Sequence, residues 1–194
     1  MTYLLKNTFS VKLTTRDVIK PIIEKWHYSH SINGVQGTYY FGLYNQDELI
    51  GGMIFGGLAM ANQWKKYTSD KSKIIELRRL ACIDNTPQNT ESFFIGRAIR
   101  WIKQNTPIEV IISYADSNFG HTGAIYKATN FKYSGVTATG RVILYNGKRY
   151  HDKTIRTKYK GIIKPFALRV KQALSDGTAK YIPQQGKHIY LFNL

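Results

Sequence analysis

The sequence has little of three things: cysteine, acidic side chains and long apolar runs. Its 194 residues include one cysteine, Cys82, which excludes a disulfide scaffold and a zinc ribbon and is typical of a reducing compartment. No run reaches the roughly 18 apolar residues of a membrane span. The N-terminal segment MTYLLKNTFSVKLTT lacks the basic region and the long apolar region of a signal peptide. We therefore expect a soluble cytoplasmic protein.

Acidic residues are scarce enough to leave a large positive charge. The chain has 28 Lys and Arg residues against 12 Asp and Glu residues, a formal net charge of +16. Residues 141–194 hold twelve of the cations and two of the acids, so more than half of the excess lies in the last quarter of the chain. A folded domain this basic usually binds a polyanion, either nucleic acid or an anionic membrane surface.

Aromatic residues lie between the cations of this C-terminal part. Tyr145, Tyr150 and Tyr159 are there, and cations beside aromatic rings suit phosphate contacts combined with base stacking. No basic amphipathic helix of adequate length stands out, which favours nucleic acid over a membrane. The alternative is a solvated surface with ordinary lysines on edge strands. The residues expected to contact nucleic acid here are Arg141, Lys148, Arg149, Arg156, Lys158 and Lys160.

The size and the hydrophobic pattern predict one globular domain of mixed α/β (α+β) class. With 43% hydrophobic and 13% aromatic residues, the chain can bury a full core. Segment 8–15 alternates and predicts a strand, whereas Val18, Ile22 and Ile23 recur at helical spacing. A continuous apolar run at 108–115 is typical of a buried parallel strand. The order of elements predicts a single central sheet with helices on both faces.

The remaining elements follow from turn signals and periodicity. Asn45–Asp47 lies between two strand-like runs and predicts a hairpin, and Thr90 is expected to cap the helix that follows the loop at 85–89. The polar segment His27–Gly34 predicts a loop after the first helix. Further strands are expected at 37–45, 48–57, 73–84, 131–137, 141–150 and 187–193, and further helices at 121–129 and 165–174.

The segment Ile74–Gln104 is a strand that leads through a polar loop into a helix, an arrangement that can bind an anion. The free N–H groups and the dipole of the first helical turn point at one place. Side chains such as Asn89, Thr90 and Ser92 could add hydrogen bonds, whereas Glu91 would repel an anion. The alternative is an ordinary capped helix.

The segment from Ser113 to Phe131, SYADSNFGHTGAIYKATNF, resembles the last strand–helix–strand unit of the GNAT acetyltransferase superfamily. Asn130 replaces the usual glycine, and Asn can adopt the left-handed conformation needed there. The resemblance implies that Tyr126 lies near the sulfur of an acyl thioester and can protonate the leaving thiolate. The loop before the earlier helix, at 85–89, lacks both glycines of the superfamily's Arg/Gln-x-x-Gly-x-Gly/Ala pattern, which argues against a tight pyrophosphate cradle.

Six short motifs follow one another from Trp26 to the C-terminus. They are WHYS at 26–29, GTYYFG at 37–42, ELRRL at 76–80, SYAD at 113–116, GHTGAIYKATNF at 120–131 and GKHIYLF at 186–192. In combination they resemble the Mom-type DNA adenine modification proteins, known from phage Mu. The resemblance implies an acetyl-CoA-binding, GNAT-like transferase that acts on double-stranded DNA, in the host cytoplasm if it is phage-encoded. The resemblance further implies that the product is N6-carbamoylmethyl (acetamido) adenine, and that this modification protects the DNA from host restriction endonucleases.

The resemblance also assigns site residues. The catalytic positions are His27, Tyr28, Arg78, Asp116 and Tyr126, and the expected donor site comprises Leu80, Cys82, Asn89, Thr90 and Ser92. His27 and Tyr28 lie in a polar loop, where catalytic side chains are common, although His27 could instead be a helix C-terminal cap. Asp116 ends a buried strand, where ligands collect in open α/β sheets, although it could instead cap the turn that follows.

Arg78 and Arg79 are expected on opposite faces of their strand, because side chains alternate along a strand. One of them therefore points towards a helix-covered face and needs an anionic partner. Glu76 and a bound phosphate are the candidates.

Four side chains could form a metal site: His27, His30, His121 and Asp116. No tight ligand spacing supports one, and we expect none.

Adenine N6 cannot be reached while the base is stacked and paired, so the base must be flipped and held by stacking. Tyr28, Tyr39 and Tyr40 are the candidate stacking partners, and Asp116 or His27 could serve as the base for N6. Attack of N6 on a thioester carbonyl would give an acetylated base. A carbamoylmethyl group instead needs a bond to the donor's methyl-type carbon and a separate source of amide nitrogen.

Two other functions remain open. A conventional acetyltransferase of a protein or small amine would share the fold and Tyr126 but has no need of the basic C-terminal part. A DNA-binding protein with an inactive acyltransferase fold would keep that part, but it has no need of His27, Asp116 and Tyr126 together.

Overall fold

The computed structural model describes residues 8–60 and 62–194, and the chain divides into two compact units. The first unit is the chain up to Gly135 together with His188–Leu194, and the second is Val136–Lys187. The first seven residues of the segment tested for a signal peptide lie outside the described residues. Within the described residues, no helix is both long and apolar enough to cross a membrane.

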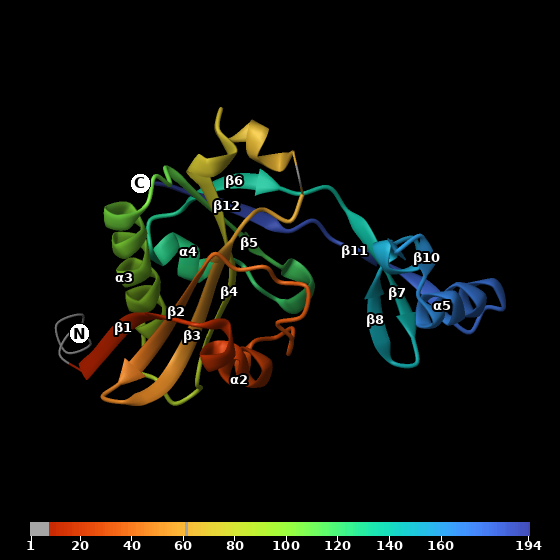
Figure 1. The fold of residues 1–194 in the computed structure, drawn as a ribbon, viewed down its shortest axis with the longest axis horizontal. Helices are drawn as coiled ribbons and strands as arrows, with labels where there is room; N and C mark the ends of the chain where they lie inside the picture. Colours follow the sequence, from red (N-terminus) through yellow and green to blue (C-terminus); the bar gives the residue numbers. More distant parts are fainter. Residues whose placement is uncertain (1–7, 61) are drawn as a thin grey trace. The chain divides into compact units, whose positions relative to one another are not determined.

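A seven-stranded sheet forms the first unit, in the order β1-β2-β3-β4-β5-β12-β6 (Figure 1). Pairing is antiparallel from β1 to β4 and between β5 and β12, whereas β4 and β5 are parallel, as the sequence predicted for the run at 108–115. The strands are β1 (Phe9–Thr14), β2 (Tyr39–Asn45), β3 (Glu48–Gly56), β4 (Ile74–Cys82), β5 (Val110–Ala115), β6 (Lys132–Val136) and β12 (His188–Asn193).

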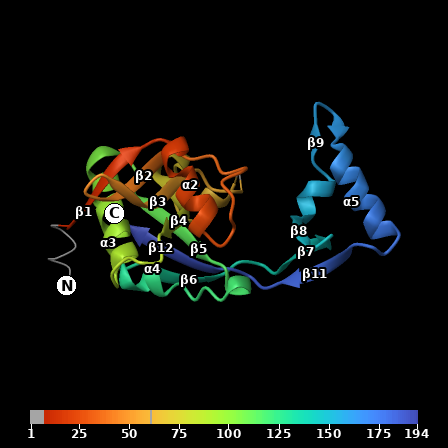
Figure 2. The same cartoon turned by 90° about the horizontal axis from the view of Figure 1, so that it is seen from below.

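Helices cover both faces of this sheet. Successive residues of β3 belong to different cores: Ile54 packs with Ile19 of one helix, and Met53 packs with Phe94 of another. Ile125 of a third helix joins the core that contains Phe94. The two faces can be followed in Figure 2. The predicted arrangement of one central sheet between helices is confirmed for this unit, and its helices are α2 (Arg16–Trp26), α3 (Thr90–Asn105) and α4 (Ala124–Ala128).

The sheet opens between β4 and β5. Their pairing ends where Leu77 lies opposite Ser113, and from there β4 stays paired with β3 and β5 with β12. A β-bulge lies at the same point, because the register of β4 against β3 passes from Leu77 to Arg79 and leaves Arg78 as the extra residue. The end of the β4–β5 pairing and the β-bulge in β4 therefore lie at the same place in the sheet.

The second unit has a three-stranded sheet in the order β11-β7-β8 and a separate hairpin of β9 and β10. Its core contains Ile143, Val170, Ala173 and Ala179. It holds all the charged residues of the basic part expected at 141–194, whereas the terminal strand of that part belongs to the sheet of the first unit. Its elements are β7 (Gly140–Tyr145), β8 (Lys148–His151), β9 (Lys158–Tyr159), β10 (Ile162–Ile163), α5 (Pro165–Ser175) and β11 (Lys180–Gln184).

Two local predictions need correction. The segment 141–150, expected as one strand, is a hairpin, because Asn146 and Gly147 take positive φ values of 48° and 72° that form a tight turn. Thr90 does not cap α3. The cap residue is Asn89, with φ 68°, and the Thr90 hydroxyl instead donates a hydrogen bond to the Pro87 carbonyl at 2.6 Å.

Gly123 fixes the start of α4, which begins at Ala124 rather than at His121 as the sequence suggested. Its φ is +77°, and a Cβ placed there would lie 2.2 Å from the buried ring of Tyr190. We expect Gly123→Ala to lower the free energy of unfolding of the first unit by about 2–4 kcal/mol, because a left-handed backbone and overpacking each destabilise a protein.

The matched control is Gly120→Ala. Gly120 has φ +75° but nothing within 4 Å of its added Cβ, so only the backbone contribution is lost. Denaturant titration followed by tryptophan fluorescence measures both variants, because Trp26, Trp64 and Trp101 all lie in the first unit. Equal losses in the two variants would contradict the predicted clash.

Candidate functional site

A cleft of about 480 Å³ lies where β4 and β5 separate. Residues from both faces of the sheet line it, since Leu80 packs with the core under α3 and Ala81 with the core under α2. The loop after α2, the loop between β5 and α4, and α4 itself complete the wall. The five positions expected to be catalytic all line this one cleft: His27, Tyr28, Arg78, Asp116 and Tyr126.

His27 is a buried, neutral side chain. Burial, followed by the charges of Arg79, His121 and His30, lowers its pKa from 6.5 to about 3. Its Nδ1 accepts the backbone N–H of Ser29 at 3.1 Å, so the proton of the neutral ring is on Nε2. His27 therefore acts as a hydrogen-bond donor through Nε2, and this tautomer has no free lone pair for the base role that we considered.

The helix-cap alternative for His27 also holds. The residue occupies the C-cap position of α2, and its backbone N–H donates to the Ile23 carbonyl at 3.1 Å. The backbone ends the helix while the side chain lines the cleft, so the two interpretations do not compete.

Tyr28 belongs to a cluster of aromatic rings beside the cleft. Its ring centroid lies 4.3 Å from that of His27, 4.6 Å from that of Phe119 and 4.8 Å from that of His121. Phe119 is 45% exposed, so the cluster presents an aromatic ring to solvent. Sequence analysis missed Phe119. Its only signal was its place in the turn that follows SYAD.

Arg78 and Arg79 both line the cleft, as do all the residues of β4 from Leu77 to Cys82. The bulge at Arg78 also interrupts the alternation of the strand that the sequence predicted for them. Arg78 Nη1 donates to the Gly57 carbonyl at 2.7 Å, while its buried Nε has no hydrogen-bond partner in the described part of the chain. Arg79 Nη1 donates to the Arg78 carbonyl at 2.7 Å. Glu76, one expected partner, accepts the backbone N–H of Ala59 at 3.1 Å. The guanidinium contacts named here are thus to carbonyl oxygens, and the cleft wall holds both cations and carboxylates.

Asp116 follows β5 directly and is buried. Its carboxylate accepts the backbone N–H of Asn118 at 3.1 Å and the side-chain amide of the same residue at 2.9 Å. It therefore caps the short 3-10 turn Ser117–Phe119, as the alternative interpretation held. It also lines the cleft, so the cap fixes the position of a carboxylate there.

Tyr126 reaches the point where the sheet opens. Its hydroxyl hydrogen-bonds the side chain of Ser113, and burial raises its pKa. The Ser113 hydroxyl in turn donates to the Leu77 carbonyl at 3.1 Å. Since Ser113 and Leu77 are the last paired residues of β5 and β4, the phenol lies at the closed end of the opening.

The expected donor-site residues separate into two groups. Leu80 and Cys82 line the cleft along β4, and burial raises the pKa of the Cys82 thiol. Asn89, Thr90 and Ser92 are not among the residues that line it. Thr90 in particular is fully buried beneath the start of α3.

The wall of the cleft also includes two carboxylates near α3, those of Asp84 and Glu91. Together with the absence of glycine from the loop at 83–89, they make this end unsuited to a pyrophosphate group. The rest of the cleft, along the open edge of β4, fits an uncharged acyl chain.

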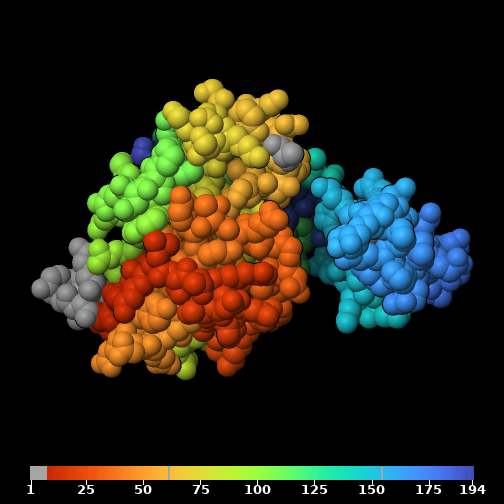
Figure 3. All heavy atoms as spheres, viewed as in Figure 1, coloured from red at the N-terminus to blue at the C-terminus, as the bar shows by residue number. Residues whose placement is uncertain are grey.

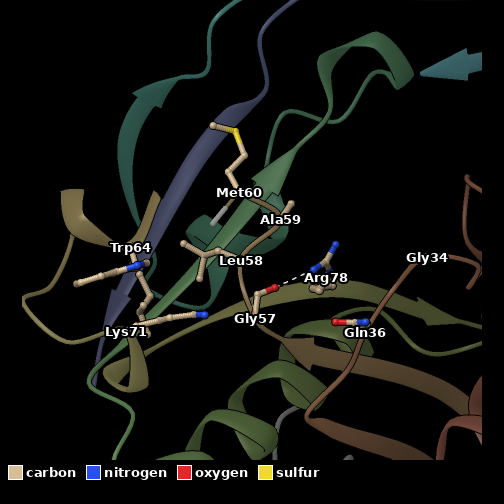
Figure 4. Close-up of a pocket in the computed structure, with 10 residues that line it drawn as sticks. Gly34, Gln36, Gly57, Leu58, Ala59, Met60, Trp64, Lys71 and Arg78 are labelled. Carbon is tan, nitrogen blue, oxygen red and sulfur yellow. Dashed lines mark hydrogen bonds between the residues drawn. The ribbon is translucent and has the colours of Figure 1, made fainter. Parts of the chain in front are cut away.

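A second pocket of about 350 Å³ lies between β4 and the segment 57–73 that joins β3 to β4 (Figure 4). Trp64, Met60 and Leu58 give it apolar walls, and Lys71 adds a cation. Arg78 lines this pocket as well as the cleft, and Figure 4 shows its hydrogen bond to Gly57. The same guanidinium thus borders both cavities.

Tyr39 and Tyr40, expected as stacking partners for a base, do not line the cleft. Both lie on β2, which β3 separates from β4. Tyr39 packs against Trp101 with ring centroids 5.5 Å apart, and the Tyr40 hydroxyl accepts the backbone N–H of Gly37 at 3.1 Å. Their positions in packed structure give the stacking prediction no support.

The six expected nucleic-acid contacts of the second unit are all exposed. Arg141 and Arg156 pair with Asp152 at 3.8 and 2.7 Å, and Arg149 donates to the Gln184 side chain. The others are Lys148, Lys158 and Lys160.

No three His, Cys, Asp or Glu side chains are grouped closely enough to hold a metal ion among residues 8–60 and 62–194. The four groups considered as metal ligands do not form such a set there.

Comparison with known proteins gives a consistent result. The model of the Mom protein family matches residues 8–194. The methylcarbamoylase Mom of Escherichia phage Mu is 29% identical over 146 residues, which are 73% of this chain and 59% of that protein. The chain therefore spans about three-fifths of the length of this curated relative.

Solved structures share the fold. An acetyltransferase of Bacillus subtilis in complex with CoA superposes with a TM-score of 0.54 at 13% identity, over 96% of this chain and 99% of that chain. A putative GNAT-family acetyltransferase of Desulfovibrio desulfuricans gives 0.53 at 9% identity, over 95% and 98% of the chains. The expected GNAT-like α/β fold is confirmed.

The buried state of His27 predicts a pH dependence. Its folded pKa of about 3 lies below the unfolded value of 6.5, so the unfolded chain binds the proton first as the pH falls. Stability should decline from about pH 6.5 towards pH 3, by about 1 kcal/mol per pH unit. The free energy of unfolding of His27→Gln, measured between pH 7 and pH 4, should depend less on pH by that amount.

A direct control is the ring nitrogen NMR spectrum of the unsubstituted protein. It should show a neutral Nε2–H imidazole for His27 between pH 7 and pH 4. Protonation of this ring near pH 6.5, or an Nδ1–H tautomer, would contradict the assignment.

Proposed function

The chain belongs to the Mom protein family, and from this premise we propose that it is a transferase that modifies adenine in double-stranded DNA. The proposed product is N6-carbamoylmethyl (acetamido) adenine, which would protect the DNA from restriction. The observation that carries the proposal is the meeting of five side chains in one cleft where the sheet opens: His27, Tyr28, Arg78, Asp116 and Tyr126. The name of the phage Mu relative, methylcarbamoylase, supports the product.

The open edge of β4 is the proposed site of an acyl-CoA donor. The proposed product requires N6 to displace a leaving group on the α-carbon of the acyl group, and an ammonia-type co-substrate to displace the thiolate at its carbonyl. Beyond Leu77 this edge has no pairing to β5 in the described part of the chain, so its backbone groups can hydrogen-bond an extended amide chain. Leu80 and Cys82 would contact the acyl arm. Asp84 and Glu91 would repel phosphates, so we place only the acyl arm in the cleft. The CoA in the B. subtilis acetyltransferase supports this class of donor.

Tyr126 is the proposed proton donor at the acyl end. Burial raises its pKa, so the phenol keeps its proton at neutral pH. The Ser113 hydroxyl orients the phenol at the point where the strands part. A neutral phenol held there can protonate a thiolate as it leaves.

The acceptor base would lie against the aromatic cluster. A flipped adenine needs a stacking surface, and Tyr28 with Phe119 offers one at the edge of the cleft. Transfer to N6 breaks an N–H bond, and the Asp116 carboxylate is the proposed acceptor of that proton. His27 would donate from Nε2 to the base or the donor carbonyl, and Arg78 would stabilise developing negative charge.

The test is mass analysis of nucleosides from the DNA of cells that express the protein, with Asp116→Asn as the inactive control. We expect a new adenine adduct that carries a carbamoylmethyl group. An acetyl adduct would be lighter by one NH and would mean attack on a thioester carbonyl. An unmodified nucleoside pool together with newly acetylated proteins would select the conventional acetyltransferase, which the fold also allows.

Tyr126→Phe tests the proton donor. The substitution keeps the ring and its contacts with Phe131 and Tyr190 and removes only the hydroxyl. We expect adduct formation to slow by about 10²–10⁴, with little change in thermal stability or in donor binding. Adduct formation at the unsubstituted rate would remove the proposed role.

Salt dependence tests the second unit as the DNA-binding part. The logarithm of the association constant for duplex DNA should fall with the logarithm of salt concentration with a slope steeper than about −3. Replacing Lys148 and Arg149 together by Gln should make the slope shallower by about 2, because each phosphate contact contributes about 0.9. Lys103→Gln, an exposed cation of α3, is the control. An affinity independent of salt would exclude this role.

A further inference from the structure

The β9–β10 hairpin of the second unit exposes two large apolar side chains directly opposite each other. Tyr159 is 63% exposed and Ile162 is 71% exposed, and they form a cross-strand pair. The hairpin lies at one end of the unit in Figure 2, and the residues near 160, light blue in Figure 3, are at its surface. A contiguous exposed apolar patch is a candidate contact site, and this pair forms one on a defined hairpin.

The turn that joins the two strands is preorganised. Lys160 and Gly161 have φ values of 49° and 81°, the combination of a tight hairpin turn whose twist matches its strands. The apolar pair therefore stands on a defined two-stranded tip, so that little conformational entropy is lost when it inserts into a partner.

Cations surround the apolar pair. Residues 153–175 contain seven Lys and Arg residues and no Asp or Glu. The amines of Lys160 and Lys164 lie 5.8 and 5.6 Å from the centre of the Tyr159 ring, and Lys158 precedes it. A partner that covers the pair would therefore be favoured by negative charge beside an apolar slot.

We infer that this hairpin is a wedge that enters the minor groove of duplex DNA and unstacks a base step. Phosphates on the two strands would meet the lysines, and the apolar faces of two neighbouring bases would meet Ile162 and Tyr159. Proteins that kink DNA insert apolar side chains between base steps in this way. The inference rests on the proposed function, because duplex DNA is the substrate proposed there. An anionic membrane shares the charge but offers no slot of stacked rings.

The experiment uses the full chain and duplexes that contain 2-aminopurine, whose fluorescence rises when it unstacks. We expect the rise at saturating protein, together with a bend measured by energy transfer between the duplex ends. Replacing Tyr159 and Ile162 together by Ser should abolish both signals and raise Kd about tenfold, as when an apolar anchor leaves an interface. The salt slope should stay unchanged because no charge is removed.

Three further variants separate the effect of the apolar pair from effects of charge, of other apolar residues and of folding. Leu168→Ser removes another exposed apolar side chain of the second unit, on α5, and should keep both signals. Lys158→Gln with Lys160→Gln should make the salt slope shallower by about 2 but keep the unstacking at saturation. Ile162→Thr preserves a β-branched residue on the strand and should weaken the fluorescence rise even if the double Ser variant does not fold.

Three outcomes would overturn the wedge. One is an unchanged fluorescence rise in the Tyr159/Ile162 double variant. Another is loss of binding to phosphatidylserine vesicles in that variant with DNA signals intact, which would make the partner a membrane. The third is a wild-type protein that binds duplexes without unstacking or bending them. A different result would contradict the proposed function: unmodified nucleosides from a protein that still unstacks and bends duplex DNA.

Discussion

Once Leu77 and Ser113 have paired, β4 and β5 are each held by a different neighbour, β3 on one side and β12 on the other, and the sheet opens between them. Backbone N–H and C=O groups inside a protein need hydrogen-bond partners, so a break in the middle of a sheet is costly unless other groups meet its edges. Tyr126 and Ser113 close the inner end. The outer edge of β4 forms a wall of the cleft, so the same break that weakens the sheet supplies its binding surface.

The bulge at Arg78 lies among the charged side chains of this cleft. In a regular strand, adjacent arginines point to opposite faces, but the extra residue interrupts this alternation, and both Arg78 and Arg79 line the cleft. Arg79 then contributes, after burial, to the low pKa of His27. The neutral state of His27 thus depends first on its burial and then on Arg79, whereas Ser29 selects the tautomer that donates from Nε2. The cleft combines two guanidinium groups, one fixed donor and the carboxylates of Asp84, Glu91 and Asp116.

Local features of the sequence predicted much of this architecture. The helix α2, the parallel strand β5 and the strand–helix–strand order of the SYAD-to-Asn130 unit depend on neighbours along the chain, and they were confirmed. The stripe of α2 was only partly right, because Val18 is exposed and Ile19 is buried with Ile23. The five positions expected to be catalytic came from the resemblance, and the structure brings them into one cleft. The bulge at Arg78 depends on the register between two strands, which periodicity does not determine. For the same reason, the alternation of Arg78 and Arg79 that we expected from a regular strand was wrong.

Other features depended on long-range packing. Phe119 meets Tyr28 only because two loops approach each other across the end of the sheet, so no spacing in the sequence indicated it. Tyr39 and Tyr40 looked available for stacking because the sequence does not show which neighbours cover a strand. The turn at Asn146 and Gly147 was different. Its signal was present in the sequence and was overlooked within a strand-like run.

The second unit adds a constraint that links stability to binding. Its 52 residues, Val136–Lys187, carry twelve cations and two acids around a small core, and a unit of this size is only marginally stable. Repulsion among its cations opposes folding. Any polyanion that binds the folded form alone stabilises it by mass action. The residues that would hold DNA and the residues that strain the unit are therefore the same, and binding relieves the repulsion that the free unit has to tolerate.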